Sequence, residues 1–157
     1  MEKLELGPRL IIVCGLPGSG KTTHAIKLER ALRAIRFCPD DWMQILEIDL
    51  YDEKMRERIE SLQWKLAQDL LVLGHIVIIE WGTWARSERD ALRTGARALG
   101  AAVELHFLDT PLDILLDRIR RRNMESPPIT DDDVVKWATI FQRPSPEEMA
   151  LFDQPEN

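Results

Sequence analysis

The chain has 157 residues, the length of one domain, and a chain of this size buries about two-thirds of its unfolded surface. Hydrophobic residues make up 45% and charged residues 31%, an ordinary balance for a globular protein that excludes a disordered chain. The 21 basic and 27 acidic residues leave a net charge of −6, which disfavours non-specific binding to nucleic acids or anionic membranes.

The start of the chain mixes charges of both signs, unlike a signal peptide, and its first apolar run, residues 10–14, is far shorter than the ~20 residues of a membrane span. Cys14 and Cys38 lie in apolar surroundings without metal-ligand spacing, so we expect two buried thiols in a reducing compartment. These features predict a cytoplasmic protein without a membrane partner.

Predicted strands and helices alternate through the first half of the chain. Residues 10–14 read as a strand, residues 20–34 as a helix after a glycine-rich turn, and residues 36–38 as a second strand. Between residues 51 and 73 the apolar positions recur every three or four residues, the period of an amphipathic helix. Residues 76–79 are all apolar, as expected of a strand covered on both faces of a parallel sheet.

The second half repeats this alternation, with a helix, a strand, a helix, a loop and a helix at residues 87–100, 103–108, 110–122, 124–129 and 130–141. Alternating strands and helices predict an α/β fold, here a single three-layer domain over residues 1–157. We expect a mainly parallel sheet of four or five strands, since no clear fifth strand follows the helix at 110–122.

The turn after the first strand fits the phosphate-binding pattern G-x-x-x-x-G-K-[ST], followed by one more threonine: Gly15, Leu16, Pro17, Gly18, Ser19, Gly20, Lys21, Thr22 and Thr23. Its glycines let backbone N–H groups point into one concavity, at the positive end of the next helix. Lys21 is placed to reach the β- and γ-phosphates, and the Thr22 hydroxyl to ligate Mg²⁺. An ordinary glycine-rich turn is the alternative, but the flanking strand and helix favour a P-loop that binds ATP and Mg²⁺.

The chain has no N-K-x-D guanine signature and no D-x-x-G switch after a strand. A small phosphotransferase is therefore the leading class. Asp40 and Asp41 follow the second strand, at the sheet edge where such folds bind ligands. A carboxylate there suits the base that accepts the proton of an attacking hydroxyl. Capping of the following helix is an equally good interpretation of either aspartate.

Two further charged features belong to the candidate site. Glu80 ends the strand beside the P-loop strand, where an acid commonly holds Mg²⁺ through a water, although it also suits a bond to a neighbouring turn. Arginines at 118–122 end a helix before a proline-containing loop and are placed to close over a triphosphate. The alternative, solvated cations at a helix C-terminus, is preferred for Arg120 and Arg121.

With these residues the chain resembles the small P-loop kinases grouped with chloramphenicol phosphotransferase, zeta toxins and the 5′-kinase domain of phage polynucleotide kinase. It is most similar to a bacterial subgroup described only as AAA-family ATPases or putative kinases. The matching stretches are residues 15–23, 40–42, 79–84, 87–90, 104–109 and 118–123, with Trp137, Phe141, Pro144, Glu147 and Glu148 in the tail. The resemblance implies Asp40 as the base, because it is the first acid after the strand. It also implies Arg118 and Arg122 as arginines of a lid at about residues 118–130.

The chain departs from this pattern at two places. Met43 stands where polynucleotide-kinase-like sequences carry an arginine, three residues beyond the base, and Glu80 replaces the usual aspartate. We therefore expect an ATP- and Mg²⁺-dependent kinase whose acceptor is a hydroxyl of a small molecule. A kinase of nucleic-acid 5′-hydroxyls and a nucleotide-dependent switch with slow hydrolysis are the alternatives.

Two sets of residues are expected to be mainly structural. His24, His75 and His106 each stand without a second ligand at metal spacing. Three tryptophans are expected in the core or a pocket wall, with a role in lining the acceptor site as the alternative: Trp42, Trp81 and Trp84.

Overall fold

The computed structural model describes residues 6–122 and 127–155, and within them one sheet of four parallel strands runs in the order β2-β3-β1-β4. The strands are β1 (Arg9–Cys14), β2 (Ile35–Phe37), β3 (Ile76–Gly82) and β4 (Ala102–Phe107). The helices of the described part are α1 (Lys21–Leu32), α2 (Pro39–Ile45), α3 (Glu53–Val72), α4 (Arg86–Ala98), α5 (Leu112–Arg122), α6 (Asp131–Ile140) and α7 (Pro146–Met149).

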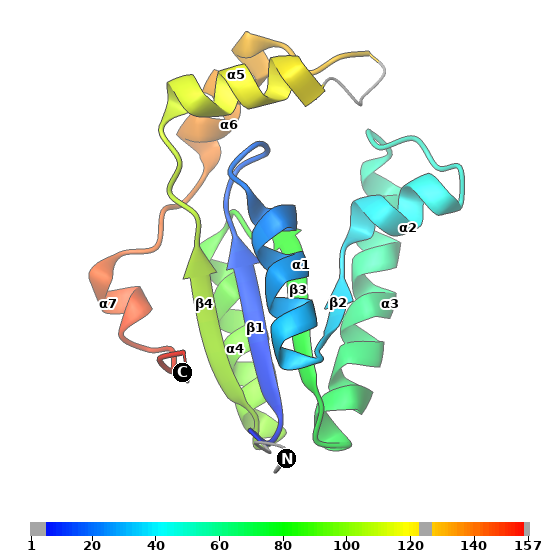
Figure 1. Ribbon diagram of the computed structural model, residues 1–157, viewed down its shortest axis with the longest axis vertical. Coiled ribbons are helices and arrows are strands. Elements are labelled where there is room, and N and C mark those ends of the chain that lie inside the picture. Colours follow the sequence, from blue (N-terminus) through cyan, green and yellow to red (C-terminus); the bar gives the residue numbers. More distant parts are fainter. Residues whose placement is uncertain (1–5, 123–126, 156–157) are drawn as a thin grey trace.

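The sheet is the middle of three layers (Figure 1). Alternate residues of β1 point to opposite faces, so Leu10 and Ile12 pack in a cluster with α3 and α4. Ile11 and Val13 pack with Ala25 of α1 on the other face. These four side chains of β1, at positions 10–13, are 0% exposed, which explains the unbroken apolar run in the sequence. The predicted three-layer α/β fold with a parallel sheet is confirmed.

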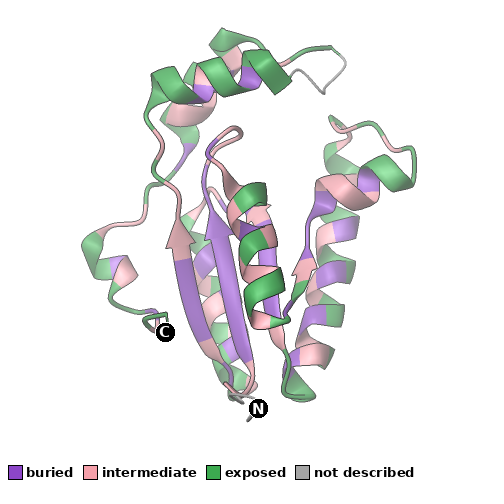
Figure 2. Cartoon of the chain, viewed as in Figure 1, coloured by how far each residue is buried: buried purple, intermediate pink, exposed green. Residues whose placement is uncertain are grey.

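The carboxyl ends of the strands face α5 and α6, which stand above the sheet as a largely exposed pair (Figures 1 and 2). These two helices bury one small cluster of their own, which includes Leu115, Ile119 and Val134, and Leu16 of the P-loop packs against it. Residues 123–126, which belong to the predicted lid at about 118–130 and overlap the predicted loop at 124–129, lie outside the described residues.

The sheet has four strands in the described part of the chain, and the C-terminal tail bonds to the outer edge of β4. The Asp153 N–H donates to the Val103 carbonyl at 2.7 Å, and the Val103 N–H donates to the Asp153 carboxylate at 2.8 Å. Most predicted bounds shift by one or two residues, and two differences from the sequence-based expectation are larger. β3 continues past Ile79 to Gly82, since its register with β1 extends there, and the short helix α7 was not predicted.

One carboxyl on α3 gives a test of stability against pH. Burial raises the pKa of Glu60 to about 7 from its ordinary 4.5, with Arg56 opposing the shift and Glu88 adding to it. The folded state therefore favours protonated Glu60, and that stabilisation is lost as the pH rises from the unfolded pKa through the folded one.

We expect Glu60→Gln to remove this dependence. After allowance for partial exposure, the stability gain of the variant over the native chain should grow by about 1–2 kcal/mol between pH 5 and pH 8. Urea unfolding at the two pH values measures it, with Asp69→Asn, a change at an exposed acid on the same helix, as the matched control. An equal gain at both pH values would contradict the assignment.

Candidate active site

The P-loop lies between β1 and α1, and its glycines leave a hollow that side chains would fill. A Cβ on Gly15 would lie 2.7 Å from the Ser19 hydroxyl, and one on Gly18 would lie 3.2 Å from the Leu115 carbonyl. Gly18 and Gly20 have φ of 82° and 98°, values that favour glycine. The Ser19 hydroxyl is buried without a hydrogen-bond partner, and no side chain caps α1. Unpaired donors around a glycine hollow at a helix N-terminus fit a bound phosphate chain.

The remaining predicted P-loop residues surround this hollow. Lys21 reaches back over the loop, where its ammonium donates to the Gly15 carbonyl at 2.9 Å. Burial lowers the pKa of Lys21, while the charges of Glu80 and Asp40 oppose that shift. Thr23 is exposed in the first turn of α1, and Pro17 is partly buried. Lys21 therefore lies across the loop, where the charges of Glu80 and Asp40 act on it.

The two residues predicted to hold Mg²⁺ are in contact. The Thr22 hydroxyl donates to Oε1 of Glu80, although the residues belong to α1 and β3. Oε2 of Glu80 accepts from Arg36 at 2.7 Å, and only 5% of Glu80 is exposed. Within the described residues no three His, Cys, Asp or Glu side chains form a metal cluster. A hydroxyl and one carboxylate fit Mg²⁺, which keeps waters and phosphate oxygens as its other ligands.

Arg36 of β2 links this pair to one of the candidate bases. Its other terminal nitrogen donates to the Asp41 carboxylate at 2.6 Å. Burial lowers the pKa of Arg36, but its hydrogen bonds with Asp41 and Glu80 raise the pKa overall. Arg36 therefore stays charged and holds Asp41 in an ion pair beside Glu80.

Asp40 has a different partner, Arg56 of α3, which donates to Oδ1 of Asp40 at 2.6 Å. Half of the Asp40 side chain is exposed, and its charge acts on Lys21. The capping alternative is wrong for both aspartates, since Cys38 is the N-cap of α2 and no side chain caps that helix. Both aspartates are thus half-exposed and paired with an arginine at 2.6 Å, Asp40 with Arg56 and Asp41 with Arg36, and the charge of Asp40 acts on Lys21.

The arginines of α5 separate into different environments. Arg118 donates to the Gly18 carbonyl of the P-loop at 3.1 Å, and Arg122 is exposed at the end of the helix. Arg120 pairs with Asp131 of α6, and Arg121 pairs with Asp117 one turn earlier at 3.2 Å. Arg118 is the α5 arginine that the structure places on the loop, whereas Arg120 and Arg121 form exposed ion pairs.

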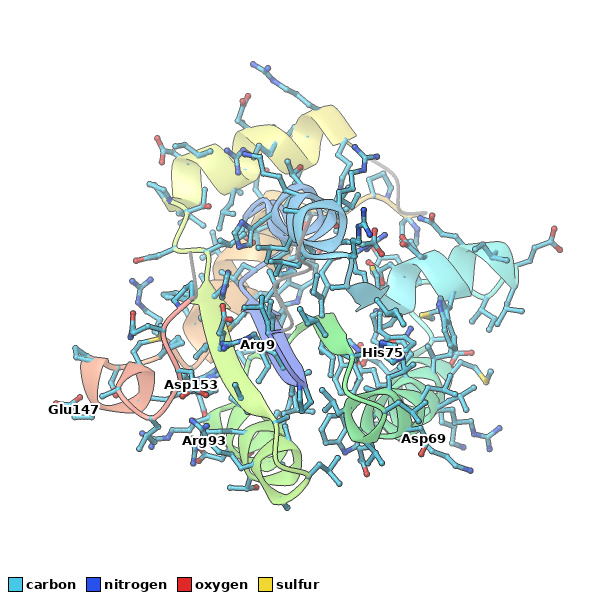
Figure 3. All side chains as sticks on the ribbon, turned by 60° about the horizontal axis from the view of Figure 1, so that its bottom comes forward. Arg9, Asp69, His75, Arg93, Glu147 and Asp153 are labelled. Atoms are coloured by element: carbon cyan, nitrogen blue, oxygen red, sulfur yellow. The ribbon has the colours of Figure 1, made fainter. Side chains whose placement is uncertain are left out.

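Two of the three histidines lie together and link separate elements, as structural residues do. Nε2 of His24 lies 2.7 Å from Nδ1 of His106, whose Nε2 lies 2.7 Å from the Glu104 carboxylate. Burial lowers the pKa of His24, and His106 adds to the shift. His75 is exposed just before β3 (Figure 3). The pair joins α1 to β4 across 82 positions of sequence, so no local spacing pointed to it.

The tryptophans pack against the main core cluster. Trp42 meets the edge of Phe37, and Trp84 lies 5.9 Å from Trp137 between ring centres. The Trp81 N–H donates to Gln63 at 2.8 Å. These contacts favour a core role.

Both cysteines are buried, as expected. Burial raises the pKa of the Cys38 thiol to about 12, and the charge of Glu80 adds to the shift.

The parallel sheet and the glycine loop between β1 and α1 define a P-loop nucleotide-binding fold. The sequence model described as an AAA domain matches residues 10–144, so the chain belongs to the AAA domain family. This match, together with solved structures of P-loop kinases, confirms the resemblance to small P-loop kinases. Comparison with curated proteins gives no match. Among the described residues, no helix is long and apolar enough to cross a membrane.

Three solved structures illustrate the similarity. A chain of the Pnkp1/Rnl/Hen1 RNA repair complex is 26% identical with a TM-score of 0.72, and the match covers 94% of this chain and 47% of that one. This protein thus spans about half the length of that relative. A gluconokinase from Sinorhizobium meliloti is 20% identical with a TM-score of 0.61, over 89% of this chain and 78% of that one. Chaetomium thermophilum Kti12 in complex with ADP-AlF3 is 18% identical with a TM-score of 0.67, over 88% and 82%. The last two show the shared fold.

Proposed function

We propose that this protein is an ATP- and Mg²⁺-dependent phosphotransferase that moves the γ-phosphate to a hydroxyl of a small molecule. The observation that carries the proposal is a convergence at one end of the sheet. The P-loop with Lys21 follows β1, the half-exposed carboxylate of Asp40 follows β2, and Glu80, in contact with Thr22, lies near the end of β3.

Each of these residues has a role that its position supports. The P-loop N–H groups and Lys21 bind the β- and γ-phosphates, and Thr22 and Glu80 hold Mg²⁺, directly or through a water. Bound Mg²⁺ neutralises charge on the phosphates. Asp40 accepts the proton of the acceptor hydroxyl as its oxygen attacks. Arg118 and Arg122 stabilise the negative charge of the transferring group from the lid side.

A small acceptor is supported by the position three residues after Asp40. The residue there is Met43, which is fully buried and carries no charge, so this position offers no cation to a polymer phosphate. The net charge of −6 also opposes binding of a polyanion. A gluconokinase among the structures that share the fold shows that the fold carries small-molecule kinases. One observation favours the rival, a nucleic-acid 5′-hydroxyl kinase, namely the similarity to a chain of an RNA repair complex.

A transfer screen tests the proposal. The chain is incubated with γ-labelled ATP, Mg²⁺ and a panel of sugars, nucleosides, sugar acids and amino alcohols, with a 5′-hydroxyl oligonucleotide in parallel. We expect label on a small hydroxyl compound and no oligonucleotide binding at physiological salt. Label on the 5′ end together with tight, salt-sensitive binding would favour the rival. ATP loss without any labelled organic product would favour a switch.

Arg118→Ala tests the lid contribution. An arginine that acts on charge developed during transfer should affect the rate more than ground-state binding. We expect kcat to fall by about tenfold or more while the Kd for ATP changes by less than about threefold. Arg122→Ala should show the same pattern. Arg121→Ala, which removes an exposed ion pair on the same helix, is the matched control. Equally small effects of all three changes would show a solvated helix end.

A further inference from the structure

The helix α4 carries an arginine that is fully withdrawn from solvent. Arg89 is 0% exposed, and its charge is balanced by Glu148 of α7, which is 1% exposed. Nε and Nη2 of Arg89 donate to the two carboxylate oxygens of Glu148 at 2.6 and 2.9 Å. A buried charge pair is weak support for stability by itself, because desolvation offsets much of the attraction. The other partners of Arg89 indicate what else it does.

Arg89 also binds the turn that follows β3. Its Nη1 donates to the Thr83 carbonyl at 2.7 Å, and the Cys14 thiol lies 3.6 Å from the same oxygen. Thr83 has φ of 47°, in the left-handed region that favours glycine, and its hydroxyl is buried without a partner. The preceding carbonyl, that of Gly82, accepts from the N–H of Gly15 at 3.3 Å. This turn therefore contacts the first residue of the P-loop, and Arg89 binds the same turn through the Thr83 carbonyl.

The third attachment is to the chain that returns from the lid. We call residues 141–145, between α6 and α7, the return segment. Nη2 of Arg89 donates to the Gln142 carbonyl at 2.6 Å, and the Gln142 N–H donates to the Trp84 carbonyl at 2.9 Å. Phe141 stacks on Phe107 at the end of β4, with ring centres 5.6 Å apart. One guanidinium thus joins the turn behind the P-loop, the return segment and α7.

The geometry points to Arg89, paired with Glu148, as a positioning residue that fixes α5 and α6 over the P-loop; we call these two the lid helices because the predicted lid joins them. Resting on the proposed function, this inference assigns a role to two stretches that the active site does not use, residues 87–90 and 147–148. The lid is attached to the body at both ends, and its outgoing end carries Arg118, which touches Gly18. A less firmly bound return segment would leave the lid helices, and Arg118 with them, free to shift relative to the P-loop. Small displacements of such charged groups strongly lower the rate of the chemical step.

The test separates positioning from stability. Arg89→Met with Glu148→Leu replaces the buried pair by apolar side chains, a change that is often neutral for folding. We expect a urea midpoint close to that of the native chain. With a non-hydrolysable ATP analogue bound, amide exchange in α5 and α6 should be faster by about tenfold. In the transfer assay kcat should fall by about tenfold. The Kd of the analogue should change by less than about threefold in either direction.

The control is Arg93→Met, one turn further along α4, beside the C-terminal tail (Figure 3). Arg93 pairs with Asp90 on its own helix and lies 5.5 Å from the centre of the Phe152 ring. It should leave lid exchange unchanged. If the folded double variant has amide-exchange rates in α5 and α6 and a kcat within about twofold of the native values, the inference is overturned.

Should the double variant fail to fold, Arg89→Lys decides, since it keeps the charge but has a single donor group. Faster lid exchange at an unchanged urea midpoint supports positioning, and unchanged exchange overturns it. The exchange readout needs no acceptor. A native chain that transfers no phosphate therefore counts against the proposed function and not against this inference.

Discussion

Lys21→Ala should lower phosphate transfer by about a hundredfold or more and weaken ATP binding by about tenfold. Lys21 is the cation that the structure places across the P-loop, with its ammonium on the Gly15 carbonyl and its charge coupled to Glu80 and Asp40. Alanine removes that charge from the β- and γ-phosphates, while Glu80 and Asp40 keep their arginine partners. Steady-state rates and calorimetric ATP titrations measure the two effects separately.

Lys27→Ala is the matched control, because Lys27 is exposed on the same helix. It should change both quantities by less than about twofold, as expected of a surface charge. The P-loop interpretation is wrong if Lys21→Ala leaves affinity and rate within about threefold of the native chain, well below the loss of one charge-assisted bond.

Asp40→Asn should leave ATP binding intact and lower kcat by about a hundredfold or more, the usual scale for a general base. Asparagine keeps the shape of the side chain but cannot accept the proton of the acceptor hydroxyl. Arg56 loses the ion-pair partner that lies 2.6 Å away, so urea unfolding of the variant is measured beside its kinetics. A normal urea midpoint with a depressed kcat isolates the chemical step.

Asp41→Asn is the discriminating comparison. Asp41 is bound to Arg36, which also holds Glu80, so its loss should act on metal affinity more than on proton transfer. We expect a decrease in kcat of less than about tenfold that added Mg²⁺ partly restores. If Asp41→Asn shows the large Mg²⁺-insensitive loss and Asp40→Asn does not, the base is Asp41.

The elements that could be predicted from the sequence are those whose signal is local. The buried strand β1 and the P-loop are neighbours along the chain, and a phosphate-binding loop needs only a strand, glycines and a helix in succession. The period of α3 was equally visible. Its bounds, Glu53–Val72, fall within the predicted 51–73.

The contacts around the site could not be predicted because they join residues far apart in sequence. Arg36 and Glu80 are separated by 44 positions, and Arg89 and Glu148 by 59. An arginine inside a short predicted strand is the one signal that pointed to Arg36, since an unpaired charge is rarely buried. Arg56 gave no signal, because a charge on a long amphipathic helix is ordinarily solvated. The choice of Asp40 over Asp41 rested on resemblance, and it stays a prediction because each aspartate is paired with an arginine at 2.6 Å.

The central claim is that the γ-phosphate goes to a hydroxyl of a small molecule rather than to water or to a nucleic acid. The most direct measurement incubates the chain with γ-labelled ATP, Mg²⁺ and a cell extract restricted to compounds below about 1 kDa, the size range of pocket-bound ligands. The label is then divided among inorganic phosphate, organic phosphates and added 5′-hydroxyl RNA. We predict a new labelled organic phosphate that forms with the native chain and is lost with Asp40→Asn. Label found only in inorganic phosphate at equal rates in both proteins, or only on RNA ends, would contradict the account.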